Sequence, residues 1–155
     1  MAPLPIRGLL VPVADSRQRA TGLTDMNKRF YLSTQKDRNV DAAPLLDALK
    51  SNGWERTFDW ADREASGPSE YSDLAVAEIA GIRDADVVIV ILPGGRGTHV
   101  EIGAALAMGK PVIIHAPNRK ILETPYPCAF HYHSMVKLLF SERLDVEGLL
   151  ACIIK

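Results

Sequence analysis

A charge-free run of β-branched residues, Val87 to Ile91, constrains the fold of this 155-residue chain more than any other feature. β-Branched side chains favour strands, and a strand that is apolar on both sides has to be covered on both faces. Helices provide that cover on the two faces of a parallel sheet. The run therefore predicts a central parallel strand in an α/β protein.

The chain from residue 29 onward alternates between strand-like and helix-like segments. We predict strands over residues 29–33, 54–60, 87–91, 111–115 and 135–140, with helices over 40–51, 72–83, 98–108 and 145–153. This alternation predicts a flavodoxin- or Rossmann-like, doubly wound, five-stranded parallel sheet with strand order 2-1-3-4-5. Residues 1–25 precede the pattern and are interpreted as an N-terminal extension, with one α/β domain over 26–155.

Composition and charge exclude several classes of partner. The formal net charge is −1 and the acidic and basic residues are interspersed, so we expect no basic face that would bind polymeric nucleic acid. No apolar run approaches the roughly 18 to 20 residues of a membrane span. Cys128 and Cys152 show no CxxC spacing, which favours free thiols in a reducing compartment, and we expect a cytoplasmic protein.

The glycine-rich turn after residue 91 is the best candidate for a binding site. In doubly wound sheets, ligands bind beyond the carboxyl ends of the strands where the strand order reverses, here between the first and third strands. Gly94, Gly95 and Gly97 allow positive φ angles and close approach of the backbone. A helix that begins at Thr98 would offer free N–H groups to an anionic or hydroxyl-rich ligand.

Glu101 has two interpretations. Thr98 and Glu101 match the S/T-x-x-E capping box, in which Thr98 is the N-cap and the glutamate only stabilises the helix end. Alternatively, Glu101 projects its carboxylate above the sheet as a functional group. A dinucleotide site is disfavoured, because no GxGxxG motif follows the first strand.

Three segments resemble the nucleoside 2-deoxyribosyltransferase family. They are residues 30–33, residues 85–97 and the E-x-G-x-A-x-A-x-G-K-P stretch over 101–111. The run PGGRGTHVE over 93–101 also resembles the PGGxGTxxE motif of the lonely-guy cytokinin nucleotide phosphoribohydrolases. Both groups break the bond between a base and its sugar. The resemblance therefore implies an enzyme acting on the N-glycosidic bond.

The resemblance also implies roles for individual residues. It makes Glu101 the nucleophile, Tyr31 the group that orients it and Glu78 a supporting acid, which we take as the candidate general acid. The family usually has Asp where this chain has Glu78. The transferases also carry a base-contacting acid in the glycine turn, near Gly95 here, and its absence weakens the case for base exchange.

Substrate binding is assigned to the loop after the first strand and to the glycine turn. Lys36 and Arg38 would neutralise a 5′-phosphate held at the helix N-terminus, unless their loop is only a solvated one. Trp60 either stacks on the base or packs in the core or at its rim. The expected substrate-binding residues are Ser33, Lys36, Arg38, Gly94, Gly95, Arg96, Gly97 and Thr98.

No cofactor or metal is expected. Cys128, His131 and His133 form a C-x2-H-x-H pattern that matches no common zinc spacing and lacks an evident fourth ligand. His99 is interpreted as a capping residue at the surface and His115 as a structural residue.

The predicted function is cleavage or transfer of the N-glycosidic bond of a (deoxy)nucleoside or nucleoside 5′-monophosphate. Water as acceptor would make the protein a hydrolase, and a second base would make it a transferase. The alternative is a non-catalytic nucleotide-binding or sensor module with an inert, capping Glu101. We also expect a homodimer or larger homo-oligomer, with Ile121 and Tyr126 in its interface.

Overall fold

The computed structural model describes residues 28–36, 41–60, 63–123 and 127–154. The predicted N-terminal extension, the phosphate-binding candidate Arg38 and the interface candidate Tyr126 lie outside these residues.

One parallel sheet forms the centre of the molecule. Its strands are β1 (Lys28–Ser33), β2 (Trp54–Arg56), β3 (Val87–Ile91), β4 (Val112–Ala116) and β5 (Val136–Phe140). They run in the order β2-β1-β3-β4-β5, and every neighbouring pair is parallel. The predicted fold class and strand order are confirmed. All five residues of β3 are buried, as a strand covered by helices on both faces requires.

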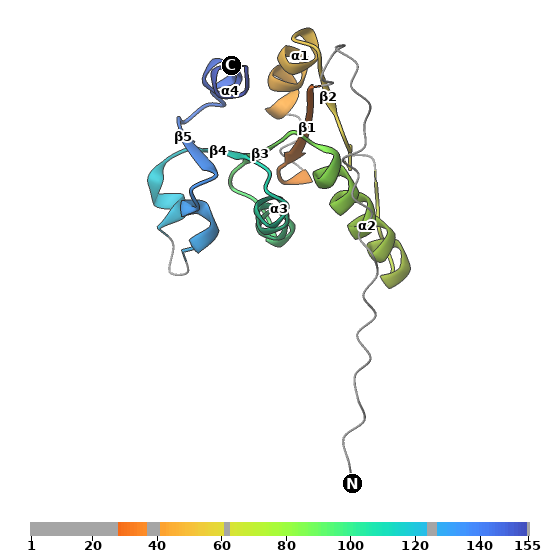
Figure 1. Cartoon of the computed structure of the whole chain (residues 1–155). Coiled ribbons are helices and arrows are strands. Elements are labelled where there is room, and N and C mark those ends of the chain that lie inside the picture. The colour runs from red at the N-terminus through yellow and green to blue at the C-terminus, as the bar shows by residue number, and fades with distance from the viewer. Residues whose placement is uncertain (1–27, 37–40, 61–62, 124–126, 155) are drawn as a thin grey trace.

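Helices cover the two faces of the sheet in pairs (Figure 1). α1 (Ala43–Ser51) and α4 (Val146–Ile153) pack on one face, and α2 (Pro68–Asp84) and α3 (Arg96–Ala107) pack on the other. Alternate residues of β3 serve the two cores: Val88 and Val90 join the cluster beneath α2 and α3, while Ile89 joins the cluster beneath α1 and α4. The period-2 alternation of a strand therefore holds both layers together.

Two boundaries differ from the prediction in ways that matter for the site. β2 ends at Arg56, so Trp60 lies in the loop that follows the strand instead of inside it. α3 begins at Arg96, before the expected start at Thr98. The segment predicted to be irregular contains two short 3-10 helices, η2 (Arg119–Leu122) and η3 (Ala129–Tyr132).

A helix needs about 20 apolar residues to cross the bilayer core. Within the described ranges, no helix combines the necessary length with the necessary apolar composition. Ile121, proposed from the sequence as an interface residue, is partly buried and packs against the core cluster beneath α2 and α3.

Candidate active site

The candidate site lies where the strand order reverses, at the carboxyl ends of β1 and β3. Ser33 ends β1 and pairs in register with Val90 of β3, so the residues after both strands emerge side by side. The chain then turns through Gly94 and Gly95 into α3, which carries Glu101 in its second turn. This is the position at which open α/β sheets bind their ligands.

Two hydroxyl groups from β1 hold the carboxylate of Glu101. The phenolic hydroxyl of Tyr31 donates to Oε1 at 2.6 Å, and the hydroxyl of Ser33 donates to Oε2. The two donors alternate along the strand, and both are fully buried. Glu101 itself is only 8% exposed. A donor on each oxygen fixes the plane of the carboxylate before any ligand arrives, which is the preorganisation that a reacting group needs.

The capping-box interpretation of Glu101 is wrong. Gly95 is the N-cap of α3, and the helix start has no side-chain cap. Thr98 lies inside the helix, and its side chain packs back over Gly94, where an added Cβ would come within 2.5 Å of the Thr98 Cγ2 atom. Glu101 is a full turn too far along the chain to cap the helix and bonds to β1 instead.

The glycine turn does not use the positive φ angles that glycine allows. In the described residues, the glycines with positive φ are Gly53 and Gly109, which follow α1 and α3. Glycine is required at position 94 by the close approach of Thr98 and not by its backbone angles. Gly94 therefore serves a contact between the turn and its own helix.

The environment keeps Tyr31 protonated. Burial, followed by the negative charge of Glu101, raises the pKa of the Tyr31 phenol far above its ordinary value. A phenol that retains its proton at every relevant pH is a permanent donor to the carboxylate. Gly81 of α2 makes this arrangement possible, since a Cβ there would lie 2.7 Å from Phe58 Cβ and 3.1 Å from the Tyr31 ring.

Glu78 of α2 faces the same space as Glu101. Burial, and then the charge of Glu101, raises the pKa of the Glu78 carboxyl above its ordinary value. The two acids therefore have different environments. The Glu101 carboxylate accepts hydrogen bonds from two hydroxyls, whereas the surroundings of Glu78 favour its protonated form. Many glycosidases use a pair of carboxyl groups whose environments differ in this way, with one as the nucleophile and the other as the acid.

A cavity of about 260 Å³ lies above Glu101. It is lined by Thr34, Gln35, Lys36, Trp60, Glu78, Gly95, Gly97, Thr98 and Glu101. The hydroxyl of Thr34 is buried and has no hydrogen-bond partner among the described residues. A buried polar group without a partner is unfavourable, so this hydroxyl is available to a bound ligand.

The cavity adjoins a second hollow of about 400 Å³, which shares Lys36, Trp60 and Glu78 with it. Arg63, Tyr71 and Leu74 are among the additional residues that line this outer part. The Trp60 indole N–H donates to the Leu32 carbonyl at 3.3 Å, which anchors the ring at the junction. The indole therefore lines the cleft and is not a core residue.

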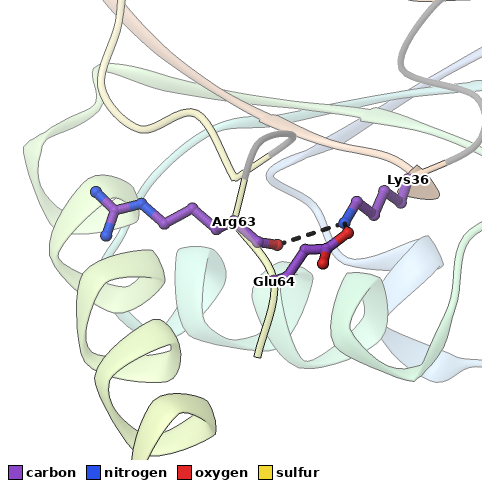
Figure 2. Close-up of polar contacts among 3 residues, drawn as sticks. All are labelled: Lys36, Arg63 and Glu64. Atoms are coloured by element: carbon purple, nitrogen blue, oxygen red, sulfur yellow. Dashed lines mark hydrogen bonds and ion pairs between the residues drawn. The ribbon is translucent and has the colours of Figure 1, made fainter. Parts of the chain in front are cut away.

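Lys36 is attached only weakly to its surroundings. Its ammonium group lies 3.5 Å from the Arg63 carbonyl oxygen and 3.6 Å from Oε1 of Glu64 (Figure 2). Both side chains of the ion pair are exposed, 53% for Lys36 and 91% for Glu64. Such exposed pairs contribute at most about 1 kcal/mol, so a more highly charged ligand can replace Glu64 as the partner of Lys36.

The fold brings together most of the residues predicted from the sequence. Tyr31 and Ser33 lie behind Glu101, whereas Glu78, Lys36, Gly95, Gly97 and Thr98 line the cavity. Gly94 and Arg96 do not line it: Gly94 supports Thr98, and Arg96 is exposed at the start of α3.

The sequence prediction did not single out Thr34 and Gln35, although both follow the first strand at the reversal point. It also missed Arg63 and Tyr71, which come from beyond β2 and from the first turns of α2. No motif signals these two residues, because only the folded chain brings the loop after β2 and the start of α2 to the cleft.

Known proteins share the sequence pattern and the fold of this chain. Residues 30–141 match the family model described as nucleoside 2-deoxyribosyltransferase, which confirms the resemblance seen in the sequence. No curated protein matches the sequence significantly.

Solved structures match over most of the chain. The CMP N-glycosidase BcmB of Clostridium botulinum is 24% identical, with a TM-score of 0.61 over 81% of this chain and 99% of that one. The solution structure of BlsM is 20% identical, with a TM-score of 0.55 over 82% and 86% of the two chains. A 2-deoxyribosyltransferase of Bacillus psychrosaccharolyticus is 20% identical, with a TM-score of 0.50 over 62% and 81%. At these identities the likeness concerns the fold.

Proposed function

We propose that this chain, which belongs to the nucleoside 2-deoxyribosyltransferase family, is an enzyme that cleaves the N-glycosidic bond of a nucleoside 5′-monophosphate, with Glu101 as nucleophile. The observation that carries the proposal is the double hydrogen bond from Tyr31 and Ser33 to the buried Glu101 carboxylate at the base of a cavity. A glutamate that only stabilised a helix would not need two donors from another strand.

The reaction has two steps. A carboxylate oxygen of Glu101 attacks the anomeric carbon of the sugar, and the bond from that carbon to the base nitrogen breaks with its electron pair on the base. Glu78 supplies the proton that the departing base requires, which its raised pKa favours. Water then attacks the anomeric carbon of the glycosyl ester, a proton passes from this water to Glu78, and the sugar phosphate leaves while the Glu101 carboxylate is regenerated.

Tyr31 and Ser33 act as positioning residues in this scheme. They hold the nucleophile in one orientation, and their bonds to the carboxylate have to weaken as its charge passes into the ester. The oxocarbenium-like transition state carries positive charge at the anomeric carbon, and the nearby carboxylate stabilises that charge. Trp60 is suited to contact the base through its ring, since the indole N–H is already bonded to Leu32.

Other residues that line the cavity support the proposal that the substrate carries a 5′-phosphate. Gly95, Gly97 and Thr98 present the start of α3, where free N–H groups and the helix dipole favour an anion. Lys36 lines the same cavity and can exchange Glu64 for the phosphate. The Thr34 hydroxyl adds a donor without a partner among the described residues. BcmB, which shares the fold, is a CMP N-glycosidase, and CMP is a nucleoside 5′-monophosphate.

Water is the proposed acceptor. The transferases that this chain resembles have a base-contacting acid in the glycine turn, whereas here the corresponding position is near Gly95, which has no side chain. A second base would therefore lack one of its contacts. We accordingly favour the hydrolase over the transferase.

The proposal is tested by incubating the protein with nucleosides and 5′-monophosphates, in the ribo and deoxy series, and measuring the release of free base. Glu101→Gln keeps the size of the side chain and removes its charge, so we expect turnover to fall by about a thousandfold or more with ligand binding retained. Glu123→Gln is the matched control, because Glu123 is exposed and lines neither the cavity nor the outer hollow. Nucleotide binding without turnover in the wild type would favour the sensor module instead.

We also propose that the protein is a cytoplasmic homodimer. Large apolar side chains are exposed on α2 and α3, the helical layer beside the cleft: Tyr71, Val76 and Val100. Tyr71 lines the outer hollow as well, so a partner on this face would cover the substrate. The free thiols of Cys128 and Cys152 suit a reducing compartment. Light scattering of the wild type and of Val76→Asp with Val100→Asp tests the dimer, and a wild-type monomer would contradict it.

A further inference from the structure

We infer that His99, Cys128 and His131 form a binding site for Zn²⁺ that joins η3 to the first turn of α3. One ligand atom from each residue lies within 4.8 Å of the ligand atoms of the other two. The inference does not rest on the proposed function, because none of the three residues lines the cavity above Glu101.

His131 provides the independent sign of a missing ligand. It is only 4% exposed, and neither of its ring nitrogens has a hydrogen-bond partner in the described part of the chain. Its ring lies 5.2 Å from the His99 ring, centroid to centroid. A buried imidazole without partners is unfavourable in an empty site, and a metal ion on one of its nitrogens would remove that cost.

One ring nitrogen of His99 is already hydrogen-bonded, which leaves the other as the potential ligand. Its Nδ1 lies 3.0 Å from the Gly95 carbonyl oxygen, so Nδ1–H donates to that oxygen and Nε2 carries the lone pair. A hydrogen bond from the second ring nitrogen to a backbone carbonyl is the usual support of a metal-bound histidine. The carbonyl belongs to the N-cap of α3, so the metal site and the helix start are connected directly.

The chemistry of the donor set selects zinc over the common hard cations. One thiolate and two imidazoles suit Zn²⁺, while Mg²⁺ and Ca²⁺ require oxygen ligands. Tetrahedral Zn²⁺ with ordinary bond lengths spaces such ligand atoms about 3.3–3.6 Å apart. Because the three ligand atoms already lie within 4.8 Å of one another, the cluster has to contract by at most about 1.5 Å to hold the ion. Cys128 loses its proton to solvent when the ion binds. Cys128 and His99 are both partly exposed, which lets water reach the fourth position.

The residue that the sequence pattern offered as a third ligand has another role. His133 Nδ1 accepts a hydrogen bond from the Met135 backbone N–H at 3.2 Å. The fold replaces it with His99, which is 29 residues before Cys128 in the sequence and therefore invisible to a search for local spacing.

The experiment titrates the untagged full-length protein with Zn²⁺ by calorimetry and with Co²⁺ by absorption, since a bound thiolate gives cobalt a charge-transfer band in the near ultraviolet. Wild type should bind one equivalent of either ion and ignore Mg²⁺. His99→Ala and Cys128→Ser should each weaken binding by at least about 10- to 100-fold. Changing a residue that is only hydrogen-bonded to a metal ligand already costs about that much affinity, and loss of a ligand itself should cost no less. Zn²⁺ should raise the unfolding temperature of the wild type and not of these variants.

His133→Ala and Cys152→Ser are the matched controls, because they remove the other candidate histidine of the pattern and the other free thiol of the chain. Both should bind Zn²⁺ as the wild type does. Circular dichroism without metal verifies that each variant is folded. His99 and Cys128 are mutated because both are partly exposed, so the buried His131 is left in place. Absence of stoichiometric binding, binding that survives Cys128→Ser, or an equal loss in either control would overturn the inference.

Discussion

The phenolic hydroxyl of Tyr31 donates a 2.6 Å hydrogen bond to the carboxylate of Glu101, 70 residues further along the chain. The bond joins the first strand of the sheet to the helix that follows the third. Ser33 joins the same two elements through the other carboxylate oxygen. The floor of the site is therefore made by β1 and α3, two regular elements of the fold.

Removing the Tyr31 hydroxyl should affect catalysis more than stability. In Tyr31→Phe the ring still fills its place beside Gly81, while Glu101 loses the donor to one oxygen. We expect kcat to fall by about 10- to 100-fold and the free energy of unfolding by about 1 to 2 kcal/mol. Base-release kinetics and denaturant unfolding measure the two effects. Tyr132→Phe, at an exposed tyrosine, is the control. An unchanged kcat in Tyr31→Phe would remove Tyr31 from the mechanism.

Base release should decline on the alkaline side through the ionisation of Glu78. Its pKa is raised by burial and by Glu101, so the carboxyl is protonated below this raised value and loses its proton as the pH rises through it. The other charged groups that line the inner cavity are Lys36 and Glu101. In Glu78→Gln we expect a lower rate that no longer declines over this range. A pH profile of kcat/KM with the same alkaline limb in both proteins would show that another group is the acid.

The phosphate contact should depend on Lys36. In Lys36→Ala we expect kcat/KM for a 5′-monophosphate to fall about tenfold or more, the effect of one charge-assisted hydrogen bond, with the value for the nucleoside nearly unchanged. Added salt should reduce the wild-type preference for the monophosphate. Lys120→Ala, at an exposed lysine of η2, is the control. Equal rates on nucleoside and monophosphate in the wild type would mean that the turn binds the sugar alone.

The two adjacent glycines of the turn should respond differently to alanine. A Cβ at Gly94 would lie 2.5 Å from Thr98 Cγ2, whereas a Cβ at Gly95 meets nothing within 4 Å. Gly94→Ala should therefore lower the free energy of unfolding by about 1 to 3 kcal/mol, as overpacking does. Gly95→Ala should leave it within about 0.5 kcal/mol. Thermal or urea unfolding measures both. A larger loss for Gly95→Ala would show that the turn needs glycine for its backbone angles.

The sequence by itself determined the order and type of the elements, because hydrophobic periodicity is a local property. The run Val87 to Ile91 has to be buried on both sides, and that requirement alone implies the layered architecture. The position of Glu101 near the strand-order reversal follows from the same pattern. Its interpretation as a nucleophile came from the resemblance of the stretch over 101–111 to a known family.

Only the tertiary structure decided which groups meet. Thr98 and Glu101 satisfy the capping-box spacing, yet the helix begins earlier, at Arg96. The Glu101 carboxylate instead accepts hydrogen bonds from Tyr31 and Ser33. Likewise, the local pattern offered His133 beside Cys128, while packing brought His99 there from α3. Contacts of this kind join residues tens of positions apart, and their energies depend on how helices pack on the sheet. A local sequence pattern contains no information on that packing, so the partners of these side chains emerge only in the folded chain.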